Sequence, residues 1–195
     1  MSTPTASSRP TASTVVLPTM LGVLLVALIA FGAYGYQSLA GGSVRSAAEY
    51  RERVAETRAA GERALSDLEP IPATSGGSLD ETSSSCVDDF GFDDTGVIRD
   101  EPTYEWTLEF PSADAYHAAV EKLRATWTDR DLSVKRVPAP GPGESGAGLR
   151  GISTTDENGI ELYLTPDWYS GEPVLRVTGG CIRHEYSYED LGRAE

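Results

Sequence analysis

Apolar and polar residues alternate strictly along residues 103–110, where Tyr104 and Trp106 share one parity. A period of two predicts a half-buried strand, which Pro111 would end. Ser112 then stands at a helix N-cap position, and apolar residues recur after it with helical spacing. The apolar stripe of this predicted helix consists of Tyr116, Ala119, Val120, Leu123 and Trp127.

A hairpin further along the chain is predicted to its register. A three-residue loop, Glu157–Gly159, with its glycine in the left-handed conformation, pairs Asp156 with Ile160. Ile152 then lies opposite Leu164, and apolar residues gather on one face. A two-residue Asn-Gly loop would mix apolar and polar residues on both faces, so the longer loop is favoured.

Two further strands complete the predicted domain. One begins at residues 132–134 and the other spans residues 174–182, while the Pro/Gly-rich residues 139–148 form a loop. The order strand, helix, strand, strand, strand predicts an α+β domain of two layers, an antiparallel sheet with one helix packed on one face.

Residues 15–36 contain no charged side chain. As a helix this segment is long enough to cross a hydrocarbon core of about 30 Å. Tyr34 and Tyr36 stand at its end, where aromatic rings favour the headgroup level. We expect an uncleaved transmembrane anchor; the alternative is a secretory signal cleaved after residues 38–40.

Residues 43–69 are predicted to form a charged helix. Ser46 and Glu49 have capping-box spacing, and Pro70 would end the helix. Small side chains make its apolar stripe a poor helix–helix seam, so we interpret the helix as a solvated stalk, with a weak coiled coil as the alternative. The stripe consists of Tyr50, Val54, Thr57, Gly61, Ala64 and Leu68.

Composition divides the rest of the chain. The N-terminal residues are rich in Ser, Thr and Pro with too few apolar residues to fold, and the segment after Pro70 reads as a flexible linker. The predicted order is a disordered cytoplasmic tail (1–14), a transmembrane helix (15–36), a stalk helix (43–69), a flexible linker (70–85), an extracytoplasmic α+β domain (86–183) and an acidic tail (184–195).

The net charge of −14 lies entirely in residues 79–195, where 24 Asp and Glu face ten Lys and Arg. Such a surplus repels phosphate backbones, so nucleic acid is excluded as a partner. It also repels an anionic bilayer surface. The negative charge favours binding of basic partners or keeps the protein soluble.

Cys86 and Cys181 are the two cysteines of the chain. Two thiols are too few for a zinc site, and two unrelated buried thiols are the alternative to a disulfide. We expect a disulfide, and therefore an oxidising compartment with the folded domain outside the cytoplasm. This outweighs the arginines that follow the anchor, whose number favours the opposite orientation.

No catalytic motif is present, and His117 and His184 stand outside any metal or nucleophile pattern. We therefore expect a non-catalytic domain without a cofactor. The densest acidic cluster is a weak Ca²⁺ candidate, with a solvated acidic turn as the favoured interpretation; its members are Asp88, Asp89, Asp93 and Asp94. Candidate partner-contact residues are four aromatic residues, for which packing over the open sheet face is the favoured interpretation; they are Trp168, Tyr169, Tyr186 and Tyr188.

The chain resembles small single-pass or lipid-anchored envelope proteins of GC-rich Gram-positive bacteria. The resemblance rests on the expected anchor, the short helix and the α+β domain bounded by Cys86 and Cys181, and on the excess of 14 Arg over two Lys. The resemblance is one of architecture and implies localisation without a mechanism. It implies a binding or accessory module of the cell envelope with an envelope protein as a possible partner. The alternatives are an envelope hydrolase with dispersed carboxylates and an oligomerising stalk protein.

Overall fold

The computed structural model describes Ile29 and residues 43–80, 86, 93 and 95–186. Residues 43–195 group into one compact unit, separate from residues 1–42. The predicted tail and, apart from Ile29, the predicted anchor therefore lie outside the described residues. Within the described part of the chain, every helix is too short or too polar to cross a bilayer.

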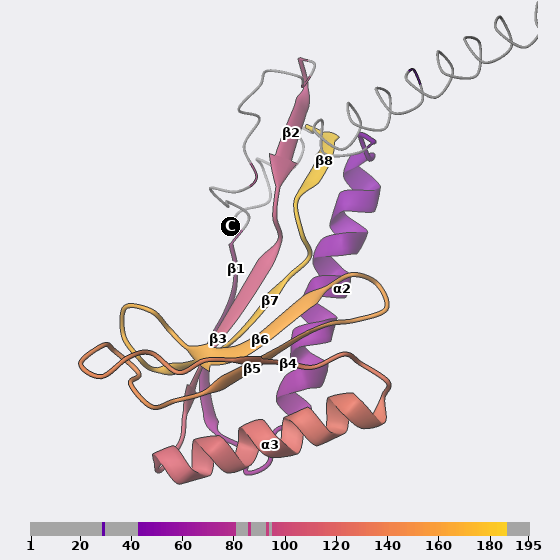
Figure 1. The fold of residues 1–195 in the computed structure, drawn as a ribbon. Coiled ribbons are helices and arrows are strands. Elements are labelled where there is room, and N and C mark those ends of the chain that lie inside the picture. Colours follow the sequence, from indigo (N-terminus) through magenta and orange to yellow (C-terminus); the bar gives the residue numbers. More distant parts are fainter. Residues whose placement is uncertain (1–28, 30–42, 81–85, 87–92, 94, 187–195) are drawn as a thin grey trace, which may run out of the picture. The chain divides into compact units, whose positions relative to one another are not determined.

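The folded unit is an antiparallel α+β structure, as predicted. A six-stranded sheet has the order β1-β3-β7-β6-β5-β4, and a two-stranded sheet pairs β2 with β8. Two helices pack on the sheet, in place of the single one expected (Figure 1). The elements are α2 (Ala47–Ser66), β1 (Ala73–Asp80), β2 (Val97–Asp100), β3 (Thr103–Glu109), α3 (Ala113–Asp129), β4 (Lys135–Val137), β5 (Gly151–Thr155), β6 (Glu161–Pro166), β7 (Pro173–Thr178) and β8 (Ile182–Glu185).

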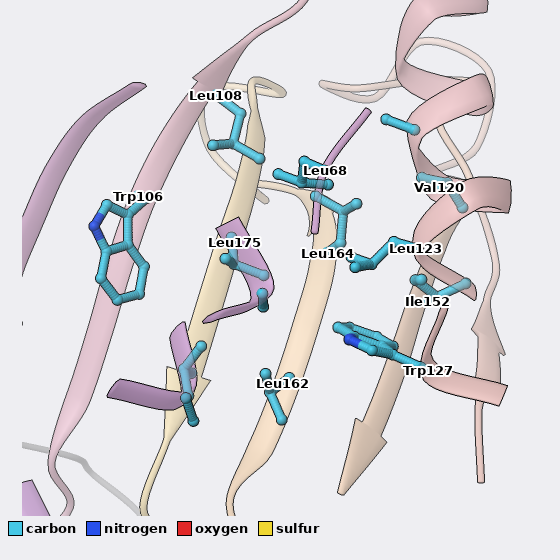
Figure 2. Close-up of a cluster of buried hydrophobic side chains, with 14 of the residues drawn as sticks. Leu68, Trp106, Leu108, Val120, Leu123, Trp127, Ile152, Leu162, Leu164 and Leu175 are labelled. Carbon is cyan, nitrogen blue, oxygen red and sulfur yellow. The ribbon is translucent and has the colours of Figure 1, made fainter. Parts of the chain in front are cut away.

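Strand β3 and helix α3 confirm the two strongest sequence patterns. The Ser112 hydroxyl accepts a hydrogen bond from the backbone N–H of Ala115 at 3.1 Å, which satisfies one of the free donors at the helix start. All five residues of the predicted α3 stripe are buried. Figure 2 shows Leu123 and Trp127 of this stripe facing Ile152 across the core.

The β5–β6 hairpin has the predicted register. The backbone N–H of Asp156 donates to the carbonyl of Ile160 at 2.9 Å, and Ile152 pairs with Leu164. Gly159 has a φ of 73°, the left-handed conformation that the three-residue loop requires. The Asp156 carboxylate also accepts from the N–H groups of Asn158 and Ile160, which holds the loop closed.

The predicted last strand is interrupted. Residues 174–182 were expected to be continuous, but β7 ends at Thr178 and β8 begins at Ile182. The break falls at Gly179 and at Gly180, whose φ of 75° does not fit a strand. Strand β8 pairs with β2 and not with a strand of the large sheet. Since β2 directly precedes β3 and β8 directly follows β7, the β2–β8 pair continues the β3–β7 pair beyond the break. The strand expected to begin at residues 132–134 begins at Lys135.

Helix α2 begins as predicted but is not a stalk. The capping box is present: the Ser46 hydroxyl accepts from the N–H of Glu49 at 3.3 Å, and the Glu49 carboxylate accepts from the N–H of Ser46 at 2.7 Å. The helix packs lengthwise against β3, β7 and β8 (Figure 1). The apolar stripe, whose small side chains suit helix–helix packing poorly, is the face of α2 that is buried on the sheet. Small side chains let the helix approach the sheet closely. The stripe is therefore not free to form the coiled coil considered above.

Part of the predicted linker is strand β1, which pairs with β3 at the edge of the large sheet. Gly76 and Gly77 have positive φ values of 96° and 85° and form a bulge in the pairing. The Trp106 indole lies against Gly77 of β1 and Gly61 of α2, where a Cβ would collide with the ring. The glycines that suggest a linker are thus packing positions around Trp106.

Replacing Gly61 by Ala is expected to destabilise the domain. Alanine favours a helix over glycine by about 1 kcal/mol, but overpacking a core costs about 1–3 kcal/mol, and here the new methyl group meets rigid ring atoms of Trp106. Urea unfolding of G61A should show a lower midpoint than wild type. The control is A55G, at an exposed position of the same helix, which reports propensity alone. A higher midpoint for G61A would mean that the indole moves freely.

Candidate binding groove

The sheet face opposite the helices carries hydroxyl and charged side chains in rows across the strands. One row joins Tyr163, Arg176 and Glu105 of neighbouring strands. Arg176 donates to the Glu105 carboxylate at 2.8 Å. The Tyr163 hydroxyl donates to the Glu161 carboxylate at 2.5 Å, and this bond raises the pKa of Tyr163 to about 12.

A groove of about 610 Å³ opens at one end of this face. Its floor is formed by Val137 of β4 and by Tyr163 and Thr165 of β6. Pro138, Pro140 and Pro166 are among its wall residues, so most of the lining is apolar. Glu144 is the only charged residue that lines the groove within the described part of the chain.

Trp168 lines the rim of this groove, and Tyr169 follows it in the turn between β6 and β7. Their exposed fractions are 79% and 85%, so both rings stand in solvent and are not packed over the open sheet face, the interpretation that the sequence favoured. The rings lie edge to face with centroids 5.7 Å apart. Two large exposed aromatic side chains on one turn form an uncovered apolar surface.

The turn that carries both rings is held by Asp167. Its carboxylate accepts from the N–H groups of Tyr169 at 3.0 Å and Ser170 at 2.8 Å, and from the Ser170 hydroxyl at 3.0 Å. The bond from the Ser170 N–H is the main cause of the lowered pKa of Asp167. The turn is therefore ordered before any ligand arrives, which reduces the entropy cost of binding.

The Gly-rich loop that also lines the groove is joined to this turn. The Ser145 hydroxyl donates to the carbonyl of Tyr169 at 3.0 Å. Gly146 and Gly171 have φ values of 72° and 74°, and their backbones approach so closely that a Cβ at Gly171 would collide with the backbone of residues 145 and 146. The loop and the aromatic turn consequently form one wall of the groove.

The remaining aromatic candidates lie elsewhere. Tyr186 is half-buried at the end of β8, where its N–H donates to the carbonyl of Gly96 at 2.8 Å, and Tyr188 is outside the described residues. Tyr163 and Thr165 carry no sequence signal that marks them as groove residues. Their parity on β6, opposite to that of the buried leucines, was readable, but their meeting with β4 and the aromatic turn was not.

The acidic cluster does not supply a calcium site in the described residues. Asp93 is mostly buried and forms ion pairs with Arg99, at 2.6 Å, and with Arg183. Its carboxylate thus compensates two guanidinium groups, while Asp88, Asp89 and Asp94 lie outside the described residues. Across the part of the chain that the structure describes, no group of three or more His, Cys, Asp or Glu is arranged to hold a metal ion.

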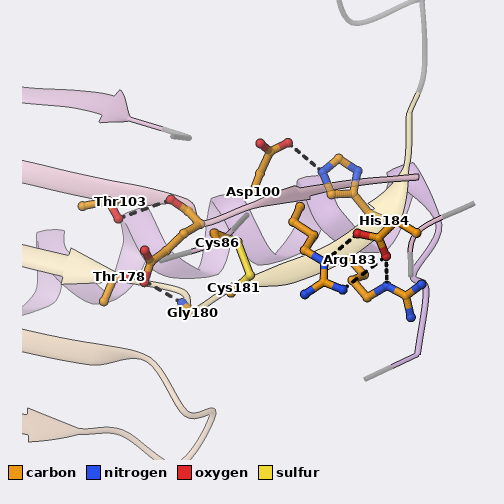
Figure 3. The surroundings of a disulfide bond; sticks show 11 residues. Cys86, Asp100, Thr103, Thr178, Gly180, Cys181, Arg183 and His184 are labelled. Atoms are coloured by element: carbon orange, nitrogen blue, oxygen red, sulfur yellow. Dashed lines mark hydrogen bonds and ion pairs between the residues drawn. A yellow bond between two sulfur atoms is a disulfide. The ribbon is translucent and has the colours of Figure 1, made fainter. Parts of the chain in front are cut away.

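The two cysteines form the predicted disulfide (Figure 3). Their Cα atoms are 5.3 Å apart, and the bond joins buried Cys86 to Cys181 in the segment between β7 and β8. Cys86 does not open the domain, however, because α2 and β1 precede it.

The side chain of His184, near the disulfide, is held by packing and a hydrogen bond. Its ring stacks on Tyr50 of α2 with centroids 3.8 Å apart, and its Nε2 lies 2.9 Å from a carboxylate oxygen of Asp100 on β2 (Figure 3). The buried ring therefore connects α2, β2 and β8. His117 is half-buried on α3, with Nε2 3.2 Å from the carbonyl of Gly148.

Comparison of the chain with protein-family models, curated proteins and solved structures finds no match.

Proposed function

We propose that this chain is a non-catalytic binding module of the cell envelope, and that a partner protein binds in the groove beside Trp168 and Tyr169. The observation that carries the proposal is the exposed aromatic pair, held in place by Asp167 at the rim of an apolar groove. Aromatic side chains in ordered positions are the residues that most often dominate binding energy at protein interfaces. Most of the groove residues come from the sheet and the loops joined to it, so the site is largely preformed.

The lining favours an extended, proline-containing segment with a basic residue. Grooves walled by aromatic and proline side chains fit the polyproline II conformation, which is extended before binding. Glu144 lines the groove, and Glu161, which is not a lining residue, accepts a hydrogen bond from Tyr163 of the groove floor, so a Lys or Arg of the ligand would meet complementary charge.

Residues 15–36 are proposed as the anchor that holds this module at the membrane, with the folded unit outside the cytoplasm. The uncharged length of that segment and the Cys86–Cys181 bond support the proposal, because disulfides persist in oxidising compartments. A protease added to intact spheroplasts should then degrade the folded unit. Protection of the unit until the membrane is lysed would contradict this orientation.

Binding is tested by titrating proline-rich peptides with a central Lys or Arg into the folded unit and recording the heat of binding by calorimetry. W168A should weaken binding about 30-fold, the equivalent of a loss of about 2 kcal/mol at an interface hot spot. The control is I71A, which removes an exposed apolar side chain outside the groove lining. Equal affinity of W168A and I71A, or binding of glycans in place of peptides, would contradict the proposal.

Affinity should depend on pH through Asp167. The pKa of this carboxyl is lowered in the folded protein, so its bonds to the turn are complete above the ordinary value of about 3.9 and are lost as pH falls through the lowered pKa. Peptide affinity should therefore stay level from neutral pH down to about 5 and drop below about 4. D167A should bind more weakly than wild type at neutral pH and should show a smaller acid-dependent drop, because its turn no longer depends on a carboxylate.

A further inference from the structure

Some Lys and Arg side chains of residues 97–186 form ion pairs with carboxylates, and others do not. Residues 97–186 contain nine Lys and Arg against 15 Asp and Glu. Six of the nine form ion pairs with carboxylates. The three that form no ion pair within the described residues are Lys135 and Arg136 on β4 and Arg150 directly before β5.

Two of these three side chains meet at one cavity. Arg136 pairs with Ile152 and so has the parity of the face that the helices cover, whereas Lys135 pairs with Ser153 on the open face. Arg136 and Arg150 line a cavity of about 110 Å³ between α3 and the β4–β5 edge, together with His117 and Glu121 of α3.

The described residues that line the cavity carry more positive than negative charge. Among them Glu121 is the only carboxylate, and it already accepts a hydrogen bond from Arg124 at 2.8 Å. That bond is the main cause of the lowered pKa of Glu121, and the positive charges of Arg124, Arg136 and Arg150 lower it further. Within the part of the chain that the structure describes, the guanidinium groups of Arg136 and Arg150 thus line the cavity without forming an ion pair.

We propose that this cavity binds a phosphate group. Guanidinium groups match the oxygen geometry of phosphate with paired N–H donors, and two arginines, both also open to solvent, line this cavity. The cavity is larger than the roughly 30 Å³ that one water molecule occupies in the liquid, which leaves room for one tetrahedral anion. Charges on an edge strand also discourage edge-to-edge pairing, but that role does not require two arginines that share a cavity with α3.

The site is tested by titrating inorganic phosphate into the folded unit at low salt while amide chemical shifts are recorded. Saturable shifts are expected around Arg136, Arg150 and His117, with millimolar affinity. The double variant R136Q/R150Q should bind at least about tenfold more weakly, because charge-assisted hydrogen bonds are lost. The matched control is K135Q, which removes a charge from the same strand on the other face. Shifts that do not saturate, or an equal loss in K135Q, would overturn the proposal.

A second arm identifies the source of the phosphate. Glycerol phosphate represents soluble esters, and vesicles of phosphatidylglycerol, compared with phosphatidylcholine vesicles, represent lipid headgroups. Binding to either that R136Q/R150Q abolishes supports the site and assigns the source. Binding to vesicles that persists in R136Q/R150Q would contradict it. W168A should leave phosphate binding unchanged, so the outcome is independent of the peptide groove.

Discussion

Loss of the Cys86–Cys181 bond is expected to lower the free energy of unfolding by about 4–5 kcal/mol. The bond joins residues 95 positions apart, and a cross-link over such a distance removes much of the conformational entropy of the unfolded chain. Domains of this kind have a total stability of about 5–15 kcal/mol, so the loss is a large share. Urea unfolding of C86A/C181A, followed by Trp fluorescence, measures it.

The reduced wild-type protein should unfold at the same urea concentration as C86A/C181A. A wild-type sample alkylated without reduction serves as the control for the treatment. A loss below about 1 kcal/mol would mean that residual structure already keeps the unfolded chain compact near these positions, and that the bond adds little.

Replacing Arg53 by Met is expected to cost about 3 kcal/mol or more. The Arg53 side chain is only 11% exposed. Its guanidinium donates to the carbonyls of Gly179 at 3.0 Å, Asn158 at 2.9 Å and Gly159 at 3.1 Å, and so ties α2 to the β5–β6 hairpin and to the end of β7. Hydrogen bonds from charged donors contribute about 1.5–3 kcal/mol each, and methionine fills similar space without any donor.

The matched control for R53M is R58M in the same helix. Arg58 is exposed and pairs with Glu62 at 2.8 Å, an i,i+4 surface pair that solvent screens and that therefore adds little stability. Thermal unfolding should therefore show a large decrease in Tm for R53M and a small one for R58M. Equal decreases would show that the three carbonyls are satisfied by water when Arg53 is removed.

Arg53 also illustrates what the sequence pattern left undetermined. In the sequence it is one of the positive charges that follow the anchor, and nothing nearby indicates its partners. The three carbonyls that its guanidinium binds lie 105 to 126 positions away in the chain. The same holds for the groove, where Val137, Tyr163 and Trp168 meet because β4, β5 and β6 pair side by side.

The sequence by itself determined the elements whose signals are local. The alternation in β3, the stripe and N-cap of α3, the hairpin register and the capping box of α2 each depend on residues a few positions apart, and each is confirmed. The disulfide was also predicted, because a chain with two cysteines and no metal pattern offers few other uses for them.

The tertiary structure decided which surface each face meets. An apolar stripe of small residues on α2 fits a second helix or a sheet equally well, and only the sheet brings Trp106 against Gly61. A Gly/Ser-rich segment has the composition of a linker, yet it becomes strand β1 because β3 offers an unpaired edge. The local sequence pattern determines which face of an element is buried. Contacts between distant segments determine which surface that face packs against. The groove and the arginine cavity both arise from such long-range contacts.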